Sequence, residues 1–125
     1  MIVSRLFPGN DLKISLENIM DGTEFNSGVI VTVVGSLSKT HLRMSNGTKK
    51  WFDGFFEIVS GEGTISPDGI HVHLAVSDEN GSVCGGHLLG GCVIHTTAEV
   101  CVIESEIEFK RVFDEDTGYK ELQLQ

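Results

Sequence analysis

The chain has 125 residues, of which 40% are hydrophobic and 22% are charged, and its formal net charge is −9. This length suits one domain with its own core, and this composition excludes a disordered chain. Sequence-independent DNA binding comes mostly from Lys and Arg side chains that neutralise phosphates. With 9 basic residues against 18 acidic ones, the sequence argues against direct binding of nucleic acid.

The first predicted element is a helix within PGNDLKISLENIMDG, residues 8–22. Asn10 or Asp11 is expected to cap its first turn, because Pro8-Gly9 interrupts the preceding segment. One apolar stripe at helical spacing supports the prediction: Leu12, Leu16, Ile19 and Met20. Asp21-Gly22 is expected to end the helix.

All later segments favour strands. Residues 28–37 are rich in β-branched side chains and almost continuously apolar, which predicts a central strand covered on both faces. Further strands are expected over residues 40–44, 55–66, 70–77, 82–89 and 92–109, with a loop over residues 45–54. Residues 110–125 predict a hairpin around Thr117-Gly118, or a strand with a loose tail. The sequence therefore predicts a single α+β domain over residues 1–125, a mainly antiparallel sheet with one or two helices.

The cysteines and the N-terminal segment bear on which metal ligands the chain offers and on where in the cell it is expected. Cys84, Cys92 and Cys101 are odd in number and form no CxxC pair, so we expect reduced, buried thiols. A metal site would then have to use histidine or carboxylate ligands. The first 20 residues show no apolar run after a basic start, and no segment is long and apolar enough to span a bilayer. We therefore expect a cytoplasmic protein.

Three of the five histidines lie in GIHVHLAVSDENGSVCGGHLLGG, residues 69–91. In a strand, successive side chains point to opposite faces. His71 and His73 therefore share one face, and the core face receives the apolar set Val72, Leu74 and Val76. Gly85-Gly86, just before His87, would let another backbone approach closely.

The turn between the two strands decides where His87 lies. A three-residue loop, Glu79-Asn80-Gly81, with Gly81 in the left-handed conformation, places His73 opposite His87 and makes all three imidazoles converge. A two-residue turn at Asn80-Gly81 would shift the register by one residue and send His87 to the other face. The convergence therefore depends on the type of turn.

Three converging imidazoles with an open fourth position are typical of a catalytic-type zinc site, or of a site for another divalent metal. The alternative is that His71 and His73 lie on a half-exposed sheet face and bind nothing. The two other histidines, His41 and His95, are expected at the surface or at the edge of the core.

Two further residues are candidates for catalysis. Glu57 stands among apolar neighbours in FFEIVS and could act as a general base or acid, with Arg43 as its partner or as an anion clamp. The alternative for Glu57 is a carboxylate that faces solvent from a strand. No GxSxG motif and no phosphate-binding glycine loop occurs.

The order of several motifs resembles the plants-and-prokaryotes-conserved (PPC) domain in its stand-alone prokaryotic form. The matching segments are RLFPGNDLKISL, GVIVTVVGSLSKTHLR, FFEIVSGEGTIS and DGIHVHLAVSDENGSVCGGHLLGGCVIHTTAEV, and the resemblance is strongest over residues 5–104. It implies a compact α+β fold that assembles as a homotrimer. It also implies a divalent metal at His71, His73 and His87, with zinc as the first expectation.

The resemblance also bears on whether the chain binds DNA. In plants the domain follows an AT-hook, and prokaryotic members are often labelled DNA-binding by that association. The chain lacks the RGRP-like basic core of an AT-hook, which adds to the argument from its acidic balance. Direct DNA binding is therefore not expected.

Two functions remain open from the sequence. The first is a homotrimeric, metal-binding regulatory or scaffold module that contacts proteins or a small ligand at the metal. The second is a metal-dependent enzyme that acts on a small polar substrate, with Glu57 and Arg43 beside the three histidines. The first is favoured, because the almost continuously apolar strands suit an oligomer.

Overall fold

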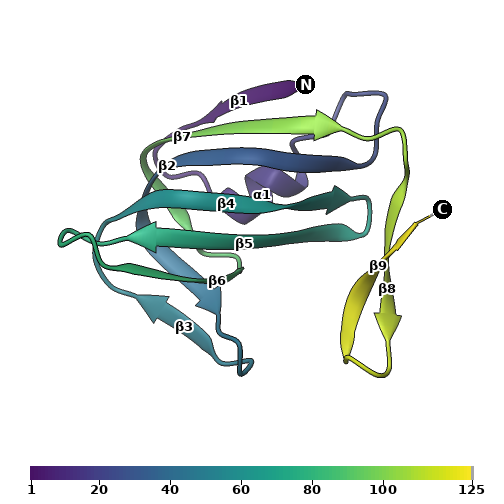
Figure 1. The fold of residues 1–125 in the computed structure, drawn as a ribbon. Coiled ribbons are helices and arrows are strands. Elements are labelled where there is room, and N and C mark those ends of the chain that lie inside the picture. Colours follow the sequence, from purple (N-terminus) through teal and green to yellow (C-terminus); the bar gives the residue numbers. More distant parts are fainter. Residues whose placement is uncertain (125) are drawn as a thin grey trace.

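The computed structural model describes residues 1–124, and these form a strongly curved antiparallel sheet with one short helix (Figure 1). The strands of the main sheet are β1 (Ile2–Leu6), β2 (Gly28–Arg43), β3 (Lys49–Phe52), β4 (Phe56–Ser66), β5 (Gly69–Ser77), β6 (Val83–Leu88) and β7 (Val93–Glu104). A separate hairpin consists of β8 (Phe109–Asp114) and β9 (Tyr119–Leu124). The predicted α+β class and the predicted C-terminal hairpin are both confirmed.

The strand order in the main sheet is β1-β7-β2-β4-β5-β6, and β3 pairs with β2. The last residues of β2 also pair with β6, so that Leu42 faces Leu88 and Arg43 faces His87. The sheet thus curls round until its β6 edge meets the end of β2, and β1 and β7 lie outside this closure. Register shifts between Ile58 and Ser60 in β4, and at several points along β2, are β-bulges of the kind that bend strands.

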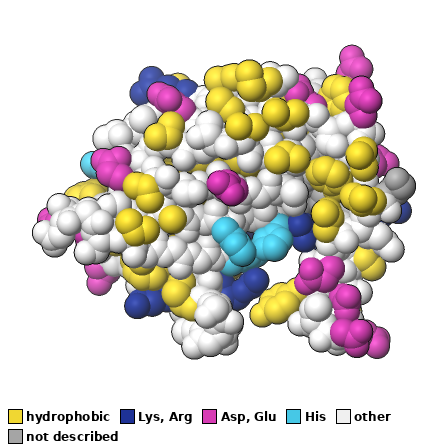
Figure 2. Space-filling model, in the orientation of Figure 1, with side chains coloured by type: hydrophobic (Ala, Val, Ile, Leu, Met, Phe, Trp, Pro, Cys, Tyr) yellow, Lys and Arg dark blue, Asp and Glu magenta, His cyan; other side chains and the backbone are white. Residues whose placement is uncertain are grey.

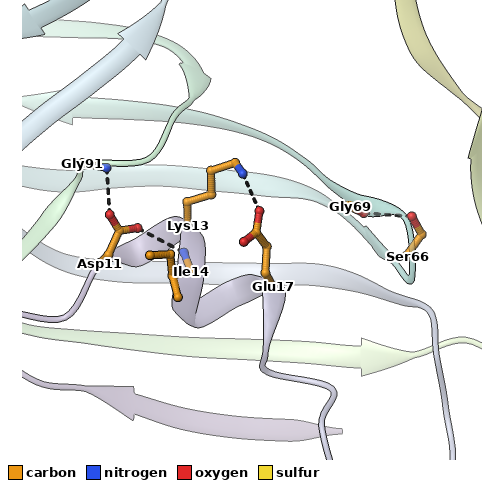
Figure 3. Close-up of polar contacts among 7 residues, drawn as sticks. All are labelled: Asp11, Lys13, Ile14, Glu17, Ser66, Gly69 and Gly91. Atoms are coloured by element: carbon orange, nitrogen blue, oxygen red, sulfur yellow. Dashed lines mark hydrogen bonds and ion pairs between the residues drawn. The ribbon is translucent and has the colours of Figure 1, made fainter. Parts of the chain in front are cut away.

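The single helix, α1 (Leu12–Glu17), lies inside the curve of the sheet, where Leu12 and Leu16 are fully buried (Figure 1). The carboxylate of Asp11 caps the helix, as predicted, by accepting a hydrogen bond from the N–H of Ile14 at 3.0 Å. Its second oxygen accepts from the N–H of Gly91 at 2.8 Å, which ties the helix to the loop before β7 (Figure 3).

The helix is shorter than the predicted span of residues 8–22. It ends at Glu17, with Asn18 as the C-cap, and the chain continues in turns. Asn and Asp compete with helical hydrogen bonds through their own side chains, so Asn18 and Asp21 favour this early end. Ile19 and Met20 still pack against the core, which is why their spacing resembled a longer helix.

Three predictions about strands are corrected. The strands expected over residues 28–37 and 40–44 are one bulged strand, β2. The loop expected over residues 45–54 contains β3, which pairs with β2 and brings Trp51 onto His41 with ring centroids 3.9 Å apart. Residues 28–37, predicted to be covered on both faces, are covered on only one face within the single chain: Val29, Val31 and Val34 are 42–50% exposed. The reason is that the only helix within residues 1–124 covers the inner face.

None of the described helices is long enough to cross a bilayer.

Candidate metal centre

The hairpin of β5 and β6 builds the candidate site. Along β5, Val72, Leu74 and Val76 are 0–2% exposed and belong to the core, and His71 and His73 point to the outer face. This alternation follows from the twofold side-chain period of a strand. The predicted placement of both histidines opposite the apolar set is confirmed.

The turn has the three-residue form that the convergence required. Gly81 has φ +80°, and the N–H of Asp78 donates to the carbonyl oxygen of Ser82 at 2.9 Å. In the resulting register His73 faces His87 directly. Only glycine adopts this left-handed conformation at little cost, so Gly81 fixes which face His87 occupies.

The glycines before His87 also have the predicted role. A Cβ atom at Gly86 would lie 2.6 Å from the carbonyl oxygen of Arg43, which is closer than any side chain tolerates. Because Gly86 lacks that atom, the end of β2 can pair with β6 beside the histidines.

The three imidazoles converge. One ring nitrogen from each of His71, His73 and His87 lies within 4.8 Å of the others, and the Nε2 atoms of His71 and His73 are 3.2 Å apart. The ring centroids are separated by 4.9, 5.2 and 5.8 Å. The candidate site therefore brings together a set of three nitrogen donors.

The surroundings favour the neutral form of two of these imidazoles, those of His71 and His87. Burial, then the positive charge of Arg43, lowers the pKa of His87 to about 4. Burial, then the charge of Arg111, lowers the pKa of His71. Neutral imidazole is the form that binds metal, because the lone pair must be free. At neutral pH both residues therefore present the form that a metal requires.

The donor set fits a borderline divalent ion. Nitrogen ligands about 2.0–2.1 Å from a tetrahedral zinc ion are about 3.3 Å from one another, so the widest separation here closes by roughly 1.5 Å on binding. Nδ1 of His87 is buried and has no hydrogen-bond partner among the described residues. An unpartnered buried nitrogen is costly, and a ligand at this site is one way to satisfy it.

Of the two predicted catalytic candidates, the structure brings only Arg43 to the histidines. Arg43 lies directly opposite His87, and its guanidinium lies over the ring of Tyr119, 4.6 Å from the centroid. Glu57 instead faces Ser36 and Ser77, is exposed, and lies five residues, about 16 Å, along β4 from Glu62, the residue that faces His73.

The structure therefore bears out the alternative for Glu57, a carboxylate that faces solvent from a strand, and does not place it as a partner of Arg43. Alternation explains this exposure: Phe56 and Ile58 point inward, so Glu57 between them points to solvent. His41 and His95 lie apart from the cluster: His41 stacks on Trp51, and His95 packs against Phe55 with its ring tilted.

Sequence reasoning missed two contributions to the site. Glu62 faces His73 across β4 and β5. Counting back through the turn that pairs Ser66 with Gly69 would have found it. The second contribution is the C-terminal hairpin, whose Arg111 and Tyr119 help to line a cleft of about 430 Å³ beside His71 and His87. Figure 2 shows the histidines at the centre of this face, between a gathering of hydrophobic side chains and the hairpin.

Comparison with known proteins agrees with the fold. A family model described as the Plants and Prokaryotes Conserved (PCC) domain matches residues 1–106. The "Bifunctional protein GlmU" of Synechococcus sp. (strain JA-2-3B'a(2-13)) is 43% identical over 123 residues, which are 97% of this chain and 20% of that protein. The chain thus spans about a fifth of the length of this curated relative.

Solved structures are similar over nearly the whole chain. A hypothetical protein from Salmonella cholerae-suis has a TM-score of 0.89 at 33% identity, covering 98% of this chain and 91% of that one. A metal-containing protein from Archaeoglobus fulgidus has a TM-score of 0.81 at 23% identity, covering 97% and 91%. A presumed DNA-binding protein from Bacteroides thetaiotaomicron has a TM-score of 0.86 at 22% identity, covering 97% and 89%. At these lower identities the likeness shows the fold alone.

Proposed function

Because this chain belongs to the Plants and Prokaryotes Conserved (PCC) domain family, the PPC domain of the sequence analysis, we propose that it is a metal-binding module of that family. In this proposal His71, His73 and His87 hold one divalent ion. The observation that carries it is the convergence of three ring nitrogens within 4.8 Å of one another. The description of the Archaeoglobus fulgidus protein as metal-containing supports the same proposal.

Zinc is the first expectation for the ion. A set of three imidazoles suits zinc and other borderline divalent metals, and three protein ligands leave a fourth position for water or a small ligand. The ion would supply a Lewis-acidic centre that recruits such a ligand. The module would thus be a regulatory or binding protein whose partner is recognised at the metal.

The alternative, a metal-dependent enzyme acting on a small polar substrate, is less well supported. It assigned the role of general base or acid to Glu57, and that residue lies away from the imidazoles. Arg43 remains in place, but a positive side chain beside the metal serves a binding protein equally well. Direct DNA binding is not part of the proposal, because the net charge of −9 opposes it.

Metal analysis of the purified chain tests the module directly. Protein produced without a histidine tag and dialysed against metal-free buffer is expected to retain about one divalent ion per chain, measured by mass spectrometry of the elements. Zinc should dominate when cells are grown without other metal supplements. A content below one ion per ten chains, unchanged after incubation with zinc, would refute the proposal.

We further propose that the chain assembles as a homotrimer. The outer apolar surface, defined as Val3, Val29, Val31, Val34 and Ile103, is 42–68% exposed. Val29 and Ile103 are direct neighbours across β2 and β7, and Val3 on β1 lies opposite Cys101, two residues along β7 from Ile103. A contiguous exposed apolar patch on a small protein marks an interaction site, and a symmetric oligomer would cover it.

Replacing Val29 with lysine is expected to dissociate the trimer, because a charge buried in an interface without a partner costs several kcal/mol. Sedimentation velocity should give a mass near three chains for the wild type and near the single chain of 13.6 kDa for the variant. Val83→Lys, at a 61% exposed position on β6 outside the outer apolar surface, is the matched control and should stay trimeric. A monomeric wild type would contradict the assembly.

A further inference from the structure

A cleft beside the three histidines has a lining that the metal site does not explain. It has a volume of about 430 Å³, which is in the range of small-molecule sites. One side is formed by His71, His87 and Arg43, and the other by Arg111 and Tyr119 of the β8–β9 hairpin. The family model ends at residue 106, so this second side comes from a segment beyond the matched domain.

The carboxylates that line the cleft are already engaged. Glu17 forms an ion pair with Lys13, as Figure 3 shows. Asp68 accepts a hydrogen bond from the backbone N–H of Arg111 at 3.2 Å. Glu121 accepts from the hydroxyl of Thr117 at 3.1 Å. None of the three forms an ion pair with either arginine of the cleft.

The two arginines, by contrast, have donors to spare. Within residues 1–124 neither Arg43 nor Arg111 forms an ion pair, although the chain carries twice as many acidic as basic residues. The Nη atoms of Arg111 donate to the carbonyl oxygen of Lys120 at 3.2 Å and to the hydroxyl of Thr64 at 3.0 Å. Its Nε atom is buried without a partner among the described residues.

Arg43 is held in a different way. Its guanidinium lies over the ring of Tyr119, 4.6 Å from the centroid, and this contact orients the group without using its N–H donors. The C-terminal hairpin therefore supplies one arginine and positions the other. Two oriented guanidinium groups without carboxylate partners, in one half-enclosed cleft, create a positive site that selects anions.

We propose that this cleft binds a small anionic ligand through a carboxylate or phosphate group that Arg43 and Arg111 recognise. The guanidinium fork matches the oxygens of either group, which is why the two chemistries share the site. The proposal deepens the metal-binding function, because a second polar group of the same ligand would reach the open position of the ion. The anion-binding half does not depend on the metal and can be tested without it.

Isothermal titration of the metal-free chain with inorganic phosphate and with malonate tests this site. At least one of the two anions is expected to bind, and the one that binds more tightly identifies the phosphate or the carboxylate chemistry. Malonamide, which has the shape of malonate without its charge, should not bind. Arg43→Gln and Arg111→Gln should each weaken binding at least about tenfold, the usual effect of losing a hydrogen bond to a charged group.

Arg5→Gln is the matched control, because Arg5 is an exposed arginine on β1 whose guanidinium contacts Phe7 and Thr97 outside the cleft. It should bind the anions as the wild type does. If Arg111→Gln lowers the melting temperature, its weaker binding no longer isolates the effect of the lost guanidinium. Anion binding by Arg43→Gln and by the charge-preserving Arg111→Lys then tests the site. Wild-type binding by both glutamine variants, or no binding of either anion at millimolar concentration, would overturn the proposal.

Metal analysis of the same variants, purified with their metal and measured before it is removed for titration, separates the two proposals. The arginine variants should retain about one ion per chain, because neither arginine is among the proposed ligands. A wild type that binds malonate but no metal would refute the metal centre and leave the anion site standing. A wild type that holds metal but binds neither anion, with or without the ion, would refute the anion site alone.

Discussion

Alanine in place of His73 or His87 is expected to reduce bound metal from about one ion per chain to less than a tenth of that amount. Loss of an outer partner of a ligand already lowers metal affinity by about 10–100-fold, and loss of a ligand itself should lower it further. His73 and His87 face each other across the hairpin, so either substitution removes one of three converging donors. Elemental analysis after dialysis, and competition with a coloured chelator, measure the change.

His95→Ala is the matched control, because His95 is an exposed histidine that packs against Phe55 and is not part of the cluster. Its metal content should equal that of the wild type. Circular dichroism would confirm that each variant keeps its sheet, as expected for substitutions on the outer face. Full metal retention by both His73→Ala and His87→Ala would show that the ion, if present, lies elsewhere.

The histidine hairpin could be predicted from the sequence because local rules determine it. Alternation sets the faces of His71 and His73, and the conformation of Gly81 sets the register that brings His87 opposite. Both rules act within a span of about twenty residues. The remaining uncertainty was the type of turn, and a glycine at the third loop position favours the form that the structure has.

The rest of the site depends on contacts between segments far apart in the sequence. The β8–β9 hairpin was predicted as a hairpin, yet no local pattern indicated that Arg111 and Tyr119 would lie beside His71 and Arg43. Their placement follows from tertiary packing, including the hydrogen bond from Arg111 to Thr64 on β4. Periodicity within one segment carries no information about such a neighbour.

Glu57 shows that apolar neighbours in sequence do not decide whether a strand residue is buried. Phe56 and Ile58 are buried, but in a strand the direct neighbours point to the opposite face, so Glu57 faces solvent. The same rule, applied through the turn that pairs Ser66 with Gly69, would have favoured Glu62 as the carboxylate beside His73. The alternation of side chains along the strands therefore predicts which carboxylate lies beside His73, and the apolar composition of the segment does not.

The strand that carries His71 depends on a glycine of its neighbour. Gly63 lies on β4 opposite Val72, and a Cβ atom there would lie 2.0 Å from the carbonyl oxygen of His71 and 2.8 Å from the Cα of Val72. Both contacts are with backbone, which cannot rotate away as a side chain can. Gly63→Ala must therefore push β4 and β5 apart at the point where the histidines are presented.

Gly63→Ala is expected to lower the free energy of unfolding by about 3 kcal/mol, the upper part of the usual range for overpacking. For a domain of this size that corresponds to a fall in melting temperature of roughly 10 °C, measured by calorimetry on metal-free protein. Metal affinity should fall as well, because the displaced backbone carries His71 and His73. Gly90→Ala is the control, since a Cβ there meets nothing within 4 Å, and its effect should stay within about 0.5 kcal/mol. If the two variants melted alike, close approach at Gly63 would not be what sets the spacing of β4 and β5.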